Sequence, residues 1–202
     1  MAWPAAQLLP HIRRVVTAHD ARGIAVARDV LVPSENMDLV PGAREATIWV
    51  TDDGLPTAEN NASDDGAQRR IDNPENFDLV PHNGTNLRST ELAPGAMTAM
   101  HRTSSLDYNI LVSGELILIT EDGAETYLHT PGDTVVQRGT LHAWRNPSAT
   151  AYTRWISILM PAEPAVVNGE RLGPLFIETP IKVDAGPAMS VEGQQMPSEV
   201  GA

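Results

Sequence analysis

The chain has 202 residues, of which 42% are apolar, and its 14 basic against 26 acidic side chains give a formal net charge of −12. This negative charge repels phosphate backbones and anionic lipid, so we expect neither a nucleic acid nor a membrane as partner. The absence of cysteine excludes disulfides, thiolate metal ligands and a cysteine nucleophile. No apolar run approaches the roughly 20 residues needed to cross a bilayer, and we therefore expect a soluble, cytoplasmic protein.

Residues 1–85 predict a strand-rich N-terminal extension. Residues 12–30 have the pattern of a hairpin, with two apolar runs on either side of a polar turn, and residues 47–51 have that of another short strand. Residues 52–75 are dense in Asp, Asn, Gly and Pro. Such a composition predicts a mobile loop.

Residues 86–160 predict a barrel, because short runs with strand character follow each other at intervals set by turns. Pro94-Gly95 and Asp122-Gly123 are typical turn dipeptides. Strands are expected over residues 87–92, 96–103, 106–113, 115–120, 125–130, 134–137, 141–145 and 152–159. Short antiparallel strands at this spacing predict an all-β fold, a double-stranded β-helix or jelly roll.

Residues 161–202 predict a loose C-terminal arm. The strand pattern weakens after residue 161, so residues 165–183 are expected to form one edge strand or arm. Residues 184–202 are rich in Gly, Pro, Ser, Gln and Glu, which predicts disorder. We interpret the whole chain as one elaborated domain.

Two glycine-bounded blocks, each with a central histidine, lie within the predicted barrel. They are Gly95-x5-His101-x-Thr103-x3-Asp107-x6-Gly114 and Gly132-x6-Gly139-x2-His142-x3-Asn146. Their spacing resembles the two motifs of the cupin superfamily, and the chain is most similar to small cupin-2-type proteins. Thr103 stands where the family has a second histidine, Asp107 where it has a glutamate, and Arg138 where it has a proline. The resemblance therefore implies the barrel together with a degenerate metal motif.

The barrel interior is expected to be polar at one place. Strand side chains alternate between faces, so an inward histidine brings the residues two positions away inward with it. The interior side chains predicted in this way are those of His101, Thr103, Asp107, Asn109, His142 and Trp144. Burying such groups costs free energy unless they are hydrogen-bonded or bound to a metal.

Two histidines and one carboxylate are the ligand count of a facial triad. We therefore expect His101, Asp107 and His142 to be metal ligands, with Gln137 as a fourth donor if it faces inward. The resemblance implies Fe, Mn, Ni or Zn as the metal. A cupin that has lost its metal stays an open alternative, because Asp107 is one methylene shorter than glutamate and a metal–oxygen bond of about 2.0 to 2.2 Å leaves little slack.

His101 and Asp107 are also the candidate catalytic residues. Without a metal, an inward His101 next to Asp107 would be an oriented general base, since the carboxylate fixes the tautomer and stabilises the imidazolium. Metal-free sugar epimerases of the cupin superfamily are similar in using a histidine–aspartate pair.

The candidate substrate-binding residues surround this pair. Arg138 is expected at the barrel mouth, where its guanidinium fork would clamp a carboxylate. Trp144 would form a flat wall for an aromatic molecule, and Thr103 and Asn109 would add polar contacts.

These features predict a cupin barrel that acts on a small organic molecule. As a mononuclear metal-dependent enzyme it would be an oxygenase, lyase, decarboxylase or isomerase, and the motif does not choose among these because fold does not fix function. A non-catalytic ligand-binding barrel and a metal-free His/Asp isomerase or epimerase remain alternatives. We expect a homodimer, since pairing hides exposed strand edges.

Overall fold

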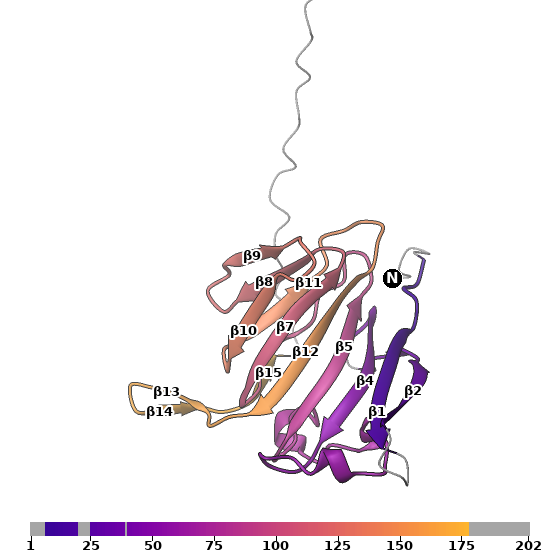
Figure 1. Cartoon of the computed structure of the whole chain (residues 1–202). Coiled ribbons are helices and arrows are strands. Elements are labelled where there is room, and N and C mark those ends of the chain that lie inside the picture. The colour runs from indigo at the N-terminus through magenta and orange to yellow at the C-terminus, as the bar shows by residue number, and fades with distance from the viewer. Residues whose placement is uncertain (1–6, 20–24, 39, 178–202) are drawn as a thin grey trace, which may run out of the picture.

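The computed structural model describes residues 7–19, 25–38 and 40–177, and the expected disorder of residues 184–202 lies outside these ranges. Nearly all of the regular structure in them is β-strand (Figure 1). The strands are β1 (Ile12–His19), β2 (Ala25–Val32), β3 (Glu35–Asn36), β4 (Ala43–Thr51), β5 (Thr85–Leu92), β6 (Met100–Arg102), β7 (Ser105–Ser113), β8 (Leu116–Thr120), β9 (Glu125–Leu128), β10 (Thr134–Arg138), β11 (His142–Arg145), β12 (Thr153–Pro161), β13 (Ala165–Val167), β14 (Glu170–Leu172) and β15 (Leu175–Ile177).

Short 3-10 helices occur between β4 and β5. They are η1 (Glu59–Asn61), η2 (Gly66–Gln68) and η3 (Pro74–Asn76). Within the part of the chain that the structure describes, no helix has the length and apolar character that crossing a membrane requires.

Two antiparallel sheets form the body of the molecule. The larger has six strands in the order β10-β7-β12-β5-β4-β3, and the smaller has five in the order β15-β6-β11-β8-β9. Between β5 and β12 the chain crosses repeatedly from one sheet to the other. The apolar core lies where the inner faces of the sheets meet, around Leu92, Leu111, Leu116, Trp144 and Trp155. The predicted all-β, jelly-roll fold is therefore confirmed.

The N-terminal part of the chain contributes to the larger sheet. The predicted hairpin is β1–β2, and it lies beside β4 (Figure 1). Arg14 on β1 donates to the carbonyl of Ile48, forms an ion pair with Asp65 and lies over the ring of Trp49. Strand β4 begins earlier than predicted and pairs along its length with β5. The division of the chain at residue 85 stays a prediction, although β3 and β4 extend the barrel sheet across it.

The segment over residues 52–75 is folded against β4 by an arginine. Arg69 forms ion pairs with Asp64 and Glu59, and it also donates to the carbonyl of Val50 on β4. Glu59 in turn accepts a hydrogen bond from the indole of Trp49 at 3.0 Å. The mobility expected from the composition stays a prediction, and these are the contacts that oppose it.

The C-terminal arm has more structure than the single strand expected. Strands β13 and β14 form a hairpin, and β15 pairs with β6 in the smaller sheet. In this pairing Phe176 lies directly opposite His101. The arm of this chain therefore packs against its own barrel, next to a residue of the first motif block.

Two motif residues have structural roles. Gly114 adopts φ +77° where β7 turns into β8, and a Cβ atom there would lie 2.9 Å from the backbone of Tyr152 and Thr153. Asn146 is fully buried, and its amide nitrogen donates to the carbonyls of Leu92, Ala93 and Ala151. Both residues serve the turns and strand ends of the barrel, which explains why the spacing predicted the fold.

Candidate functional site

Two histidines face each other across neighbouring strands of the smaller sheet. His101 on β6 and His142 on β11 are direct partners in the antiparallel register, so their side chains leave the sheet on the same face. Their ring centroids are 4.4 Å apart. Both residues line the interior cavity, as the alternation of strand side chains predicts.

Hydrogen bonds fix the orientation of both imidazoles. Nδ1 of His101 lies 2.9 Å from the carbonyl oxygen of Ala99, and Nδ1 of His142 lies 2.9 Å from that of Thr140. Because a carbonyl oxygen only accepts, each Nδ1 carries the proton, and the lone pair of each neutral ring lies on Nε2. In metal-binding histidines, a hydrogen bond of this kind from the nitrogen that does not bind the metal orients the ring.

Burial keeps these rings neutral. It lowers the pKa of His142 to about 3, with a further contribution from the neighbouring His101. The pKa of His101 is also lowered, mainly by burial and in part by the positive charge of Arg88, while its bond to Ala99 acts in the opposite direction. Both Nε2 atoms are therefore available as electron-pair donors at neutral pH.

The cavity has a volume of about 510 Å³ and lies between the two sheets. Thr103, Asp107 and Asn109 line it, as does Trp144 beside the histidines. The ring of Trp144 stands edge-on to His142 at 5.6 Å between centroids. The predicted interior positions are thus all brought to one cavity.

Asp107 belongs to the opposite wall. It lies on β7 in the larger sheet, whereas both histidines lie on the smaller one. Burial raises the pKa of Asp107 to about 6, against a smaller lowering by the Ser105 hydroxyl, and its Oδ1 has no hydrogen-bond partner among the described residues. A buried carboxyl group with one oxygen free of hydrogen bonds and a pKa near 6 is suited to exchanging a proton near neutral pH.

The structure does not bring the three expected metal ligands together at bonding distance. Among the described residues, the group of three whose ligand atoms all lie within 4.8 Å of one another is Asp52, Asp53 and Glu59, near Arg69. His101 and His142 are adjacent, but the short side chain of Asp107 starts from the other sheet. The two imidazole Nε2 atoms, which carry no proton, are the donors that this cavity offers to a metal.

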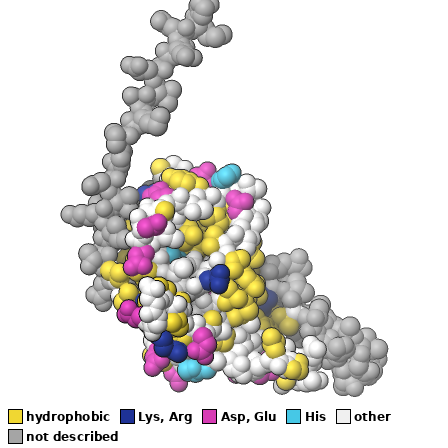
Figure 2. Space-filling model, turned by 90° about the vertical axis from the view of Figure 1, so that its left-hand side faces the viewer, with side chains coloured by type: hydrophobic (Ala, Val, Ile, Leu, Met, Phe, Trp, Pro, Cys, Tyr) yellow, Lys and Arg dark blue, Asp and Glu magenta, His cyan; other side chains and the backbone are white. Residues whose placement is uncertain are grey.

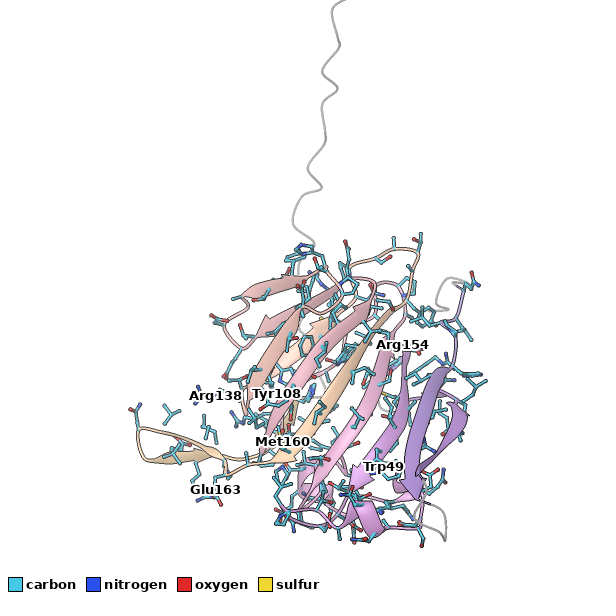
Figure 3. All side chains as sticks on the ribbon, in the orientation of Figure 1. Trp49, Tyr108, Arg138, Arg154, Met160 and Glu163 are labelled. Atoms are coloured by element: carbon cyan, nitrogen blue, oxygen red, sulfur yellow. The ribbon has the colours of Figure 1, made fainter. Side chains whose placement is uncertain are left out.

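Two further predicted residues lie outside the cavity lining. Gln137 is buried opposite Asp107, but its amide nitrogen donates to Thr140, and its oxygen has no hydrogen-bond partner among the described residues. Arg138 is exposed at the outer edge of β10 (Figure 3). Neither side chain is among those that line the cavity.

Several cavity residues were not predicted, among them three aromatic residues and an arginine. Trp155, which we expected only to pack in the core, lines the cavity, and its ring centroid lies 5.8 Å from that of Trp144. Phe77 and Phe176 form an aromatic pair at 5.8 Å on another side. Arg88 reaches the cavity from the middle of β5. The alternation of inward and outward side chains along β12 and β5 could have placed Trp155 and Arg88 in the interior. The two phenylalanines lie in a loop and in the C-terminal arm, where no such alternation predicts their position.

Comparison with known proteins identifies the family. The chain is 32% identical over 161 residues to phomopsin biosynthesis cluster protein C' of Diaporthe leptostromiformis, covering 79% of this chain and 84% of that protein. It is 30% identical over 164 residues to a cupin-domain-containing oxidoreductase of Neurospora crassa, covering 79% and 78%. The chain belongs to the cupin superfamily. No family model matches it.

Solved cupin structures are more distant. The polyketide cyclase RemF from Streptomyces resistomycificus is 14% identical, with a TM-score of 0.45 over 72% of this cupin and 80% of that chain. A cupin-2 domain from Rhodospirillum rubrum is also 14% identical, with a TM-score of 0.41 over 72% of each chain.

Proposed function

We propose that this cupin is an enzyme for a small, largely apolar organic molecule, and that it holds a divalent transition metal through Nε2 of His101 and Nε2 of His142. The observation that carries the proposal is the pair of oriented, neutral imidazoles at the wall of the cavity between the two sheets. Fe, Mn, Ni and Zn all accept imidazole nitrogen. The relatives named as cupin-domain-containing oxidoreductases support an enzymatic, metal-assisted reaction on a small molecule.

The two sheets would contribute different groups to the reaction: the smaller sheet the metal-binding histidines, and the larger sheet the proton-transferring Asp107. Such a metal supplies Lewis acidity or redox chemistry and leaves positions open for substrate. Trp144 and Trp155 offer flat apolar surfaces that position the substrate and exclude water. Asp107, facing from the other sheet with a pKa near 6, would take or return a proton on the substrate.

Metal content tests the proposal. Chelator-treated protein is incubated separately with Fe(II), Mn(II), Ni(II) and Zn(II) and then desalted. Its metal content is measured by inductively coupled plasma mass spectrometry. At least one metal should be retained at about one equivalent, and His142→Ala should lose it. Thr103→His, which places a third imidazole on the same strand face as His101, should tighten retention.

Matched controls separate this site from other metal-binding groups. His129→Ala removes an exposed histidine, and Asp53→Asn disrupts the acidic group at Asp52 and Glu59. Both variants should retain the metal. Retention below about one-tenth of an equivalent in wild-type protein, or an undiminished content in His142→Ala, would reject the metal centre.

A metal-free acid–base enzyme is the second candidate. It is favoured by the position of Asp107, which is not close enough to both histidines to complete a three-ligand set. Activity would then survive chelation and disappear in both His101→Ala and Asp107→Asn. Loss of activity on chelation with recovery on adding one metal would exclude this candidate.

We also propose that a second copy of the chain covers the outer face of β7, β10 and β12. Tyr108 lies in register between Val136 and Ile158, and Tyr108, Val112 and Val136 are 38%, 42% and 55% exposed. Figure 2, which views the molecule from the β10 side, shows apolar side chains gathered there. Patches of this kind are rare on monomers, and two-fold contacts are the commonest way to bury them.

Light scattering tests the dimer. Wild-type protein should have twice the mass of one chain at micromolar concentration, and Val136→Glu should give monomers. Tyr127→Glu, a change at a more exposed site on β9, is the control and should leave the mass unchanged. A wild-type monomer would refute the proposal.

A further inference from the structure

The cavity contains a buried arginine that no motif predicts. Arg88 lies on β5, an inner strand of the larger sheet with β12 on one side and β4 on the other. Its side chain is 10% exposed and lines the cavity. Burial lowers its pKa to about 10, so the guanidinium still carries its charge at neutral pH.

This charge has one ionic partner among the described residues. Nη2 of Arg88 forms an ion pair with Glu45 on β4, and Glu45 is itself 39% exposed. No hydrogen bond from Arg88 to another described residue accompanies the pair. A guanidinium has five N–H donors in a planar fork, and the ion pair with Glu45 engages only the Nη2 end of it. Arg88 therefore has capacity for an acceptor that enters the cavity.

The arginine and the histidines lie on opposite walls. Arg88 belongs to the larger sheet, His101 and His142 to the smaller one, and the charge of Arg88 contributes to lowering the pKa of His101. Aromatic rings of Trp144 and Trp155 occupy the space around them. A ligand that satisfies all of these groups has an aromatic or apolar body and an anionic oxygen group at one end.

We propose that Arg88 binds the carboxylate of an apolar, aromatic acid, so that the cavity selects acids over neutral molecules of the same shape. The proposal uses the cavity of the proposed function, but it requires no metal. The outer surface of this acidic protein repels anions in general. A buried cation would therefore give selectivity at the site itself. The carboxylates of Glu45 and Asp107 line the same cavity, and Glu45 competes with the ligand for Arg88.

Calorimetric titration of chelator-treated protein tests this with a matched pair of compounds, naphthalene-2-carboxylate and naphthalene-2-carboxamide. Wild-type protein should bind the carboxylate about tenfold more tightly than the amide, since hydrogen bonds to a charged group contribute about 1.5 to 3 kcal/mol. Arg88→Met should abolish this preference and still bind the amide. Glu45→Gln should increase it, because the competing carboxylate is gone.

The controls distinguish the possible failures. Retained affinity for the amide in Arg88→Met shows that the cavity is still folded, and Arg138→Met, which removes an exposed arginine, should keep the wild-type preference. No preference in wild-type protein, no binding of either compound, or a preference that survives Arg88→Met would overturn the proposal. Because metal is absent from the titration, these results are independent of whether the two histidines bind one.

Discussion

Replacing Asp107 by asparagine should make the protein more stable at neutral pH than the wild type. Burial raises the pKa of this carboxyl from 3.8 to about 6, so the folded protein holds its proton more tightly than the unfolded chain does. As the pH rises from 4 to 6, the unfolded chain loses its proton first, and the free energy of unfolding falls. At 1.36 kcal/mol for each pKa unit, the difference between the two pKa values corresponds to about 3 kcal/mol of stability. This stability is lost as the pH rises through the folded pKa, and no further change is expected above about pH 7.

The asparagine variant has no such proton to lose. Its stability relative to wild type should therefore increase by about 2.4 kcal/mol between pH 4 and pH 7. The lowered pKa of His142 acts in the opposite direction, because folding disfavours the charged imidazole and stability falls as the pH drops below 6.5. That contribution is present in both proteins and cancels in the difference.

Urea denaturation of chelator-treated protein at pH values from 4 to 8, followed by fluorescence, measures this difference. A stability difference between Asp107→Asn and wild type that stays constant across the range would refute the reasoning. It would mean that Asp107 is solvated or paired in the fold, and the carboxyl would then have no raised pKa with which to exchange protons near pH 6.

Further predictions concern the supports of the barrel. Glu91→Leu should destabilise the fold by about 3 to 5 kcal/mol in urea denaturation, since the fully buried carboxylate pairs with both Arg44 and Arg154. Glu163→Leu, which breaks an exposed ion pair, should lower the free energy of unfolding by at most about 1 kcal/mol. Equal losses of stability in the two variants would contradict the role assigned to the buried ion pairs. Gly114→Ala should cost clearly more than the roughly 1 to 2 kcal/mol of a left-handed alanine, because its Cβ would collide with backbone. Gly123→Ala, at φ +80° with open space around it, should show only that smaller cost, and a reversed order would refute the explanation.

The sequence predicts the barrel well because its signals are local. Gly114 lies at the turn where β7 leads into β8, and the hairpin pattern of residues 12–30 is formed by neighbouring residues. Asn146 instead donates to carbonyls 53 and 54 residues earlier, so only its place in the motif spacing indicated its role. Alternation along single strands also placed Asp107 and Trp144 in the interior, since that rule depends only on which face a strand buries.

The site was less predictable because it depends on distances between the sheets. His101 and His142 are partners across two strands of one sheet, whereas Asp107 comes from the other sheet, and local patterns do not fix the distance between the sheets. Arg88 carries no motif, and its importance follows from its position on an inner strand of the larger sheet. Phe176 reaches the site only because β15 pairs back onto β6, which no local pattern near residue 176 indicates.

Anomalous diffraction tests the central claim most directly. Crystals grown with each of Fe(II), Mn(II), Ni(II) and Zn(II) would be measured on both sides of the absorption edge of the metal. The account predicts, for at least one of them, a single strong peak in the cavity about 2.1 Å from Nε2 of both His101 and His142. No peak between these two atoms with any of the metals, or peaks only at Asp52, Asp53 and Glu59, would contradict it.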